Sequence, residues 1–338
     1  MLKYHQAEKL LMDKIAAFPP GTQLPPVRQL IEDSGFSQAT IMKAISLLEK
    51  RNLIERRPGS GIFTASPQVV FHGSAAVMIS VIDNHASSQV LRGIQNALAG
   101  ADNQIMLLGG GEQLENILPT LKRTGIRKLI IYPQSSDLKK TDFMKFIEHL
   151  GESEISVATI EIPIPGLRCV FVGQENTRAF EEVTISMISR GVKNIAVAGM
   201  FNSMIYASRL AGIRNAISAS GKQVYLRQID EGDGGNAATI ARKLLEGGSD
   251  AILLCNAESS REIAYGLRIL AGASLNDIAV AGVVEQNERL PLSNSITLEK
   301  QSIELGQASV QALASSRVRA RYLPMKIHYS QLYKDHTK

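Results

Sequence analysis

The sequence contains no tryptophan and only two cysteines, Cys169 and Cys255. Two cysteines so far apart in the chain support neither a disulfide framework nor a cysteine-ligated metal site. No stretch reaches the roughly 18 uncharged apolar residues that a membrane-spanning helix requires. The N-terminus, MLKYHQAEKLLMDK, mixes charged with apolar residues and has no secretory hydrophobic segment. We therefore expect a cytoplasmic protein without a membrane partner.

The residues that are present are those of a folded chain. Hydrophobic residues make up 44% of the 338 residues and charged residues 20%, which excludes a disordered or collagen-like protein. Residues 1–66 hold nine basic and six acidic residues, a net charge of +3, out of +5 for the whole chain. Over half of the positive excess thus lies in about a fifth of the chain, which is compatible with a nucleic-acid-binding face there.

Residues 1–66 carry the signals of three helices followed by a β-hairpin. Pro25 and Pro26 suit the entry to a helix, and Ser37 can cap the next one. A Pro-Gly-Ser-Gly turn follows at 58–61. The predicted elements are helices near 7–15, 26–33 and 38–48 and strands at 53–57 and 62–65.

A helix-turn-helix with a hairpin wing reads duplex DNA through one helix in the major groove, while the wing meets the backbone or minor groove. An arginine in the second helix can reach phosphate, and wing glycines permit close approach. Thr40 could instead bond within its own helix, and Arg57 could belong to a solvated strand face. The candidate DNA contacts are Arg28, Ser37, Gln38, Thr40, Met42, Lys43, Arg57, Gly59 and Gly61.

The segment LPPVRQLIEDSGFSQATIMKAISLLEKRNLIERRPGSGIFTA resembles the winged helix of GntR-type bacterial transcription regulators. The Leu-Pro lead-in, the Ser-x-x-Thr helix start and the Glu-Arg-Arg-x-Gly-x-Gly wing carry the resemblance. It implies DNA contacts from Arg28, Thr40, Lys43 and Gly61. Gln38 and Met42 stand where the family often has arginines, and glutamine prefers adenine where arginine prefers guanine, which leaves the operator sequence open.

From about residue 75, short apolar runs alternate with helical stretches of roughly 10–15 residues. The runs are AVMISVI, IMLL, KLIIY, SVATIEI, CVFV, NIAVAG, AILLC and DIAVAG. This alternation indicates parallel sheets with helices on both faces, and two such lobes fit the available length. The predicted fold class is α/β, with an N-terminal winged helix-turn-helix domain followed by a two-lobed doubly wound parallel-sheet effector domain.

Residues 75–334 resemble the effector domain of LacI/GalR-type repressors, which is itself similar to periplasmic sugar-binding proteins. The carriers are Leu91-Arg92-Gly93-Ile94, Phe171-Val172-Gly173 with Asn176, Ser208-Arg209-Leu210-Ala211-Gly212, Asn256 and Leu305-Gly306-Gln307. The resemblance implies that Arg209 reaches ligand hydroxyls, with Asn256 as the second contact. Arg209 could instead form an inter-helix salt bridge, and Asn256 could simply form a turn.

Polar residues also follow several apolar runs, at the strand ends where ligand sites of such sheets form. The candidate ligand contacts are Asp83, Asn84, Arg209, Asn256 and Glu285. Val284 stands where the family often has an aspartate, with Glu285 beside it. Ala86 and Ser87 replace two aromatic residues, so no stacking platform is evident. A sugar is the default ligand, but another polar metabolite or a loss of ligand binding remains open.

The predicted division is a DNA-binding domain at 1–66, a linker at 67–74 and a ligand-sensing and dimerisation domain at 75–334. By resemblance, the first lobe takes 75–173 and 296–322, and the second takes 174–295 and 323–334. Crossovers between the lobes are expected near 171–174, 294–298 and 322–325. A dimer interface is expected at the helices near 87–99 and 113–124.

The expected function is a ligand-responsive transcription regulator, with repression relieved by the ligand. It would bind a pseudo-palindromic operator as a homodimer, because two half-sites require two copies, and hold a small polar metabolite between its lobes. One alternative is a constitutive DNA-binding regulator whose lobes only dimerise. Another is a solute-binding protein, which the missing export signal disfavours.

Motifs of catalysis are lacking. Residues 109–111 are not followed by the Gly-Lys-Ser/Thr of a P-loop, and 232–235 lack the dinucleotide fingerprint. No histidine pair has metal-ligand spacing, and no G-x-S-x-G occurs. We therefore expect no enzymatic activity, no catalytic residue, no metal and no cofactor.

Overall fold

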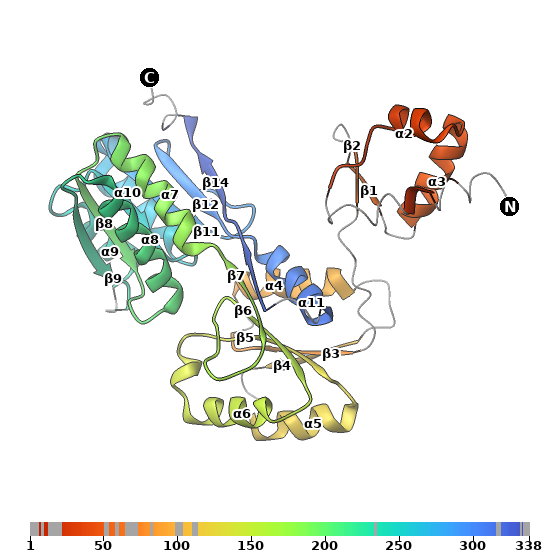
Figure 1. Ribbon diagram of the computed structural model, residues 1–338. Helices are drawn as coiled ribbons and strands as arrows, with labels where there is room; N and C mark the ends of the chain where they lie inside the picture. Colours follow the sequence, from red (N-terminus) through yellow and green to blue (C-terminus); the bar gives the residue numbers. More distant parts are fainter. Residues whose placement is uncertain are drawn as a thin grey trace. The chain divides into compact units, whose positions relative to one another are not determined.

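The structure is a computed structural model, and its chain divides into two compact units, residues 1–70 and 71–338 (Figure 1). It describes residues 7, 10–12, 22–50, 54–57, 61–64, 74–81, 84–98, 104–109, 114–232, 235–315, 319–331 and 333. The division after Val70 falls inside the predicted linker, of which only Ser74 is described. No helix among the described residues is long and apolar enough to cross a membrane.

The first unit is built around an antiparallel hairpin and short helices. Helix α2 (Val27–Ser34) begins after Pro26 and ends at Gly35, whose φ of 68° suits a glycine. Helix α3 (Gln38–Lys50) begins after Ser37, and the Ser37 hydroxyl accepts the backbone N–H of Thr40 at 3.4 Å. Strands β1 (Ile54–Arg57) and β2 (Gly61–Thr64) form the wing. The predicted stripe of α3 is buried, and it supplies Ile41, Ala44, Ile45 and Leu48 to the core.

The first lobe of the second unit is a six-stranded parallel sheet with two helices on each face (Figure 1). In sheet order the strands are β13 (Ala320–Leu323), β7 (Val170–Gln174), β6 (Ser156–Ile160), β5 (Lys128–Tyr132), β3 (Ala75–Ile79) and β4 (Ile105–Gly109). Helices α4 (His85–Leu98) and α11 (Ser302–Ala314) pack into one core. Helices α5 (Ile117–Thr124) and α6 (Thr141–Gly151) pack into the other, with the 3-10 turns η1 (Leu114–Asn116) and η2 (Asp137–Lys139) nearby.

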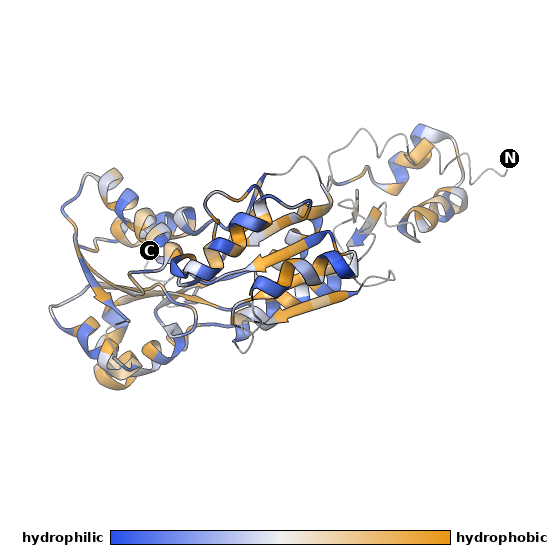
Figure 2. Cartoon of the chain, turned by 90° about the horizontal axis from the view of Figure 1, so that it is seen from below, coloured by the Kyte–Doolittle hydropathy of each residue, from blue (hydrophilic) through white to orange (hydrophobic). Residues whose placement is uncertain are grey.

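The second lobe repeats this plan. In sheet order its strands are β14 (Lys326–Tyr329), β12 (Ser295–Glu299), β11 (Ala279–Val284), β10 (Ala251–Leu254), β8 (Asn194–Gly199) and β9 (Tyr225–Asp230). Helices α7 (Asn176–Ser189) and α8 (Met204–Ser220) cover one face. Helices α9 (Ala237–Leu245) and α10 (Ser260–Ala271) and the turn η3 (Gly272–Asp277) cover the other. The strands are mostly hydrophobic (Figure 2), as expected for sheets covered on both faces.

The chain passes between the two sheets three times. It leaves the first lobe after Gln174, returns to it through Lys300 and Gln301, and leaves again at 324–325. The prediction that the first lobe resumes at 296, with a crossover at 294–298, is wrong, because residues 295–299 form β12 beside β11. Its alternating sequence, SITLE, lacks the continuous apolar run by which the central strands are predicted. The sheet of the second lobe is also not fully parallel, since β14 pairs antiparallel with β12.

Glycines let two helix pairs approach closely. A Cβ atom on Gly306 of α11 would lie 2.1 Å from the carbonyl oxygen of Val90 in α4. A Cβ atom on Gly212 of α8 would lie 2.1 Å from the carbonyl oxygen of Thr177 in α7. Both distances are far below any real carbon contact. These glycines, which belong to the motifs that carried the resemblance, are therefore required by packing.

Candidate DNA-binding and ligand-binding sites

The start of α3 presents the side chains expected to read DNA. Ser37, Gln38 and Lys43 are exposed, while Met42 is half-buried on the edge of the core. The Thr40 hydroxyl lies 2.8 Å from that of Ser37, so it bonds within the helix start, as the alternative interpretation had it. The exposed side chains at this helix start are polar, which suits a major-groove helix.

Arg28 lies in the first turn of α2 with its side chain 91% exposed. Its Nε donates to Glu32 Oε1 at 3.1 Å, one helical turn away. An exposed pair of this kind contributes only about 0.3–0.5 kcal/mol. A DNA phosphate can therefore replace Glu32 at little cost.

The wing places Arg57 opposite Gly61 in the β1–β2 register. Gly61 has φ of 114°, and a Cβ atom there would lie 2.8 Å from Nε2 of Gln23. Only the backbone of Arg57 is described, and Gly59 lies outside the described residues. Arg56, beside it, forms an ion pair with Glu49 at 3.1 Å.

In the second unit, Arg209 is buried between the lobes at 4% exposure. Its Nε donates to Asn176 Oδ1 at 2.7 Å, and its Nη1 donates to the carbonyl of Cys255 at 2.5 Å. Burial lowers the pKa of Arg209, while Cys255, Glu161 and Glu285 act in the opposite direction. The predicted alternative, a salt bridge between helices, is not formed among the described residues: the partners of Arg209 are neutral. Its positive charge is thus held in place by the second lobe.

Glu285, which follows β11, forms a buried ion pair with Lys300. Glu285 Oε1 lies 3.2 Å from Lys300 Nζ, and Glu285 Oε2 accepts the hydroxyl of Ser302 at 2.8 Å. Burial alone would raise the pKa of Glu285, but Lys300 and Ser302 outweigh burial, so this pKa lies below its ordinary value. Burial would lower the pKa of Lys300, and Glu285, Tyr132 and Glu161 raise it instead. The pair is therefore charged at neutral pH.

Glu161 and Gln174 add a second polar group from the first lobe. Glu161 follows β6 with φ of 65°, and its Oε1 accepts the backbone N–H of Gln174 at 3.1 Å. Glu161 Oε2 and the amide atoms Oε1 and Nε2 of Gln174 are buried without a hydrogen-bond partner among the described residues. Tyr132, at the end of β5, is also buried, and burial raises its pKa to about 12. Lys300 lowers this pKa, while Glu161, Glu285 and Glu258 raise it.

Asn256 follows β10 and holds an acidic side chain. Its Nδ2 donates to Glu231 Oε2 at 3.0 Å, and the hydroxyl of Ser259 donates to the same atom at 2.6 Å. Glu231 Oε1 is buried without a partner among the described residues. Asn84 of the first lobe donates to Glu258 at 3.2 Å. Asn84, Asn256 and Glu285 thus follow strands, and Arg209 reaches the end of β10 from α8. Asp83 lies outside the described residues.

The sequence interpretation missed Glu161, Glu231 and Lys300, and it did not select Gln174 as a ligand contact although it follows the run CVFV. Glu161 was counted within the run SVATIEI, although β6 ends one residue before it. Lys300 follows β12, which was not recognised as a strand. Glu231 follows β9, an exposed edge strand without an apolar run. The rule that polar residues beyond strand ends form the site would have found them, had the strand ends been known.

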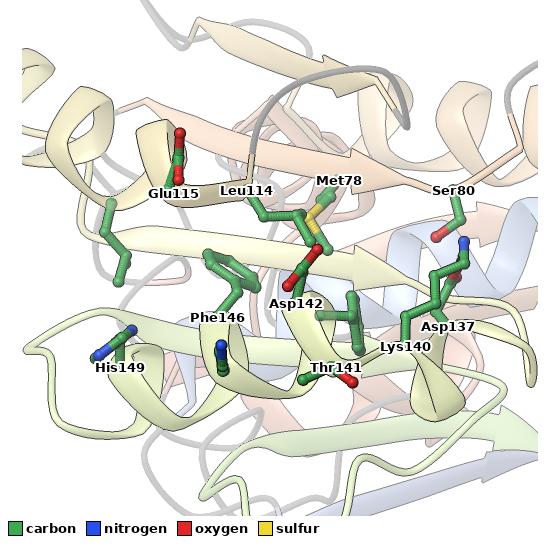
Figure 3. A pocket seen from close by; sticks show the side chains of 13 residues that line it. Met78, Ser80, Leu114, Glu115, Asp137, Lys140, Thr141, Asp142, Phe146 and His149 are labelled. Carbon is green, nitrogen blue, oxygen red and sulfur yellow. Dashed lines mark hydrogen bonds and ion pairs between the residues drawn. The ribbon is translucent and has the colours of Figure 1, made fainter.

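A separate hollow of about 680 Å³ lies on the first lobe between η1, α5 and α6 (Figure 3). Asp137 in its wall accepts the backbone N–H of Gln134 at 2.7 Å and the ammonium of Lys140 at 2.8 Å. None of the four predicted ligand contacts that the structure describes lines it. Since its buried carboxylate is satisfied, the hollow offers less to a polar ligand than the site between the lobes. The described residues include no group of three or more potential metal ligands.

Comparison with known proteins gives an independent match for the first unit. The model of the family "Bacterial regulatory proteins, gntR family" matches residues 3–64. These residues are a GntR-type helix-turn-helix domain. The GntR-type domain is 38% identical over 55 residues to the uncharacterized HTH-type transcriptional regulator Rv0494 of Mycobacterium tuberculosis, a segment covering 16% of this chain and 23% of that protein. The chain thus spans less than a quarter of the length of this curated relative.

The remainder of the chain has the fold of LacI-type regulators. A LacI transcriptional regulator from Lactobacillus brevis matches with a TM-score of 0.60 at 15% identity, over 75% of this chain and 99% of that structure. A LacI family transcriptional regulator from Enterococcus faecium, solved with bound ribose, matches with a TM-score of 0.59 at 20% identity, over 76% of this chain and 98% of that structure. The predicted fold class, a winged helix-turn-helix followed by two doubly wound lobes, is confirmed.

Proposed function

We propose that the chain is a ligand-responsive transcription regulator that binds a pseudo-palindromic operator as a homodimer and holds a small polar metabolite between its lobes. The observation that carries the proposal is the combination in one chain of a GntR-type domain with a LacI-type fold. Between its lobes, several buried polar atoms have no hydrogen-bond partner in the part of the chain that the structure describes. The protein is proposed to repress transcription, and the bound ligand to relieve that repression. The dimer interface is proposed at α4 and α5.

Polar contacts between the lobes explain how a ligand would change the second unit. Ser302 of α11 donates to Glu285, and the backbone N–H of Ile303 donates to Gln286 Oε1 at 3.1 Å. Gln89 of α4 donates to the carbonyl of Gln286 at 3.3 Å. A ligand that bridges facing strand ends adds to these contacts and favours closed lobes. Lobe closure can shift the spacing of two DNA-binding domains in a dimer, and operator affinity then changes by the ligand's differential affinity for the two states.

The alternative is a constitutive regulator whose lobes only dimerise. Val284 is fully buried in an apolar core, and Glu285 is matched by Lys300 and Ser302 within the chain. A thermal-shift panel of sugars, sugar phosphates, nucleosides and amino acids separates the two, because a bound ligand raises the melting temperature by mass action. A solute-binding role has no observation in its favour beyond the shared fold.

Two substitutions in the GntR-type domain are expected to act differently. Arg28→Ala removes a phosphate contact and should weaken binding to selected and random duplexes alike, with a salt slope smaller by about one. Gln38→Ala removes a base contact, so it should weaken the selected duplex by about 1–3 kcal/mol and leave random DNA nearly unchanged. Fluorescence titration across salt concentrations measures both. Equal losses on both duplexes for both variants would contradict the assignment of these residues.

A further inference from the structure

The two cations between the lobes, Lys300 and Arg209, already have hydrogen-bond or ion-pair partners in the chain. Lys300 is paired with Glu285 at 3.2 Å, and Arg209 donates to Asn176 and to the Cys255 carbonyl. Both side chains are at least nine-tenths buried. An anionic ligand would have to displace Glu285 from Lys300, whereas the Arg209 guanidinium keeps N–H donors beyond these two bonds for a ligand oxygen. Breaking buried charged contacts is costly because the abandoned group stays desolvated.

The unmatched atoms at the site are almost all hydrogen-bond acceptors. Among the described residues they include Glu161 Oε2, Glu231 Oε1, Gln89 Oε1 and the amide of Gln174, whose Nε2 is the one donor. Glu161 and Gln174 are only 5% and 4% exposed. Buried acceptors without donors are strongly unfavourable, so the ligand must bring donors to this site.

The charges of the residues at the site also favour a ligand that brings hydrogen-bond donors. Glu161, Glu231 and Glu285 carry three negative charges, and Arg209 and Lys300 carry two positive ones. Hydrogen bonds connect most of these groups. Glu161 accepts the backbone N–H of Gln174, whose carbonyl accepts the side-chain amide of Asn176. Arg209 donates to Asn176 and to the carbonyl of Cys255, next to the Asn256 that holds Glu231. One negative charge is left without a cation among these five residues. A buried carboxylate favours a cationic donor over a neutral one.

We infer that the ligand is a small polyol bearing one protonated amine, such as an amino sugar, whose ammonium contacts Glu161 or Glu231 and whose hydroxyls satisfy Gln174 and Gln89. This inference rests on the proposed interlobe ligand site and specifies its ligand class. Phosphorylated and carboxylated ligands are disfavoured, since they would set an anion against Glu161. The absence of tryptophan matters less for such a ligand, which is held by hydrogen bonds and charge rather than by stacking.

The test is calorimetric titration of the full-length protein at pH 6.5 with glucosamine, galactosamine and mannosamine, each compared with its parent hexose and with the hexose 6-phosphate. At least one amino sugar should bind at least tenfold more tightly than its parent hexose, and the phosphates should not bind. Glu161→Gln keeps an oxygen for the Gln174 N–H, and Glu231→Gln is the second variant. At least one of the two, the one whose carboxylate contacts the ammonium, should lose the tenfold preference. Glu152→Gln, an exposed carboxylate at the end of α6, should leave the preference unchanged.

Several results would overturn the inference: no amino sugar binds, a hexose or phosphate binds as tightly as the amino sugar, or both Glu→Gln variants retain the preference. Operator binding read in parallel separates this failure from failure of the proposed function. If a neutral or anionic compound binds and changes operator affinity, the ligand class is wrong while the regulator stands. If amino sugars bind but operator affinity never changes, the ligand class stands and the ligand response is wrong.

Discussion

Lys300→Met is expected to destabilise the second unit by about 3–5 kcal/mol, because it leaves Glu285 charged and buried without a cation. Both side chains of the pair are less than a tenth exposed. A loss of this size should lower the melting temperature by on the order of 10 °C for a unit of this length. Differential scanning calorimetry at pH 7 measures the change. A loss below about 1 kcal/mol would show that solvent reaches Glu285 and that the pair is not buried.

A double variant separates the charge from the packing. Lys300→Met with Glu285→Gln removes both charges and keeps an oxygen to accept the Ser302 hydroxyl, so it should recover more than half of the loss. The pH dependence has a defined sign. Because the folded pKa of Glu285 lies below its ordinary value of 4.5, the pair stabilises the fold above that value and this contribution is lost as the pH falls through the folded pKa. The difference between wild type and Lys300→Met should therefore shrink in acid.

Gly306→Ala is expected to destabilise the first lobe by about 3 kcal/mol through overpacking. The new methyl group would lie 2.1 Å from the Val90 carbonyl oxygen and 2.9 Å from the Ile94 nitrogen. These are backbone atoms of α4, so relief requires α11 and α4 to move apart and to open the core between them. Chemical denaturation should show a lower midpoint with an unchanged m-value.

Gly151→Ala is the matched control for this substitution. Gly151 also lies in a helix, but its nearest neighbour to an added Cβ atom is Leu167 Cδ1 at 3.9 Å, an ordinary contact. Alanine is the better helix former by about 1 kcal/mol, so stability should stay level or rise slightly. If Gly306→Ala were as well tolerated as Gly151→Ala, the close approach of α4 and α11 would be refuted.

Much of the fold follows from local sequence signals. The helix stripe of Ile41, Ala44, Ile45 and Leu48, and the apolar runs after residue 75, predict α3 and the central strands because burial demands those periods. The strands that were missed are β9, β12, β13 and β14, which lie at or near sheet edges and have mixed sequences. Half-exposed edge strands have no continuous apolar run, so only long-range pairing reveals them.

The ligand site is harder to predict than the fold, because its contacts also depend on long-range pairing. Arg209 and Asn256 lie in recognisable motifs, and the structure places both among interlobe polar groups. The Lys300–Glu285 pair joins residues that follow different strands, and it depends on the position of β12. Which acceptors remain unmatched depends on three-dimensional pairing, because a sequence does not show that Lys300 has already neutralised Glu285.

The central claim is that one chain couples operator binding to a polar ligand held between its lobes. The most direct test is selection of duplexes from random DNA by the purified full-length protein, with and without a small-molecule metabolite pool. The account predicts a two-fold symmetric motif whose binding changes when the pool is present. A motif indifferent to every pool would contradict the coupling and favour the lobes as a dimerisation scaffold, and the absence of any motif would contradict sequence-specific DNA recognition itself.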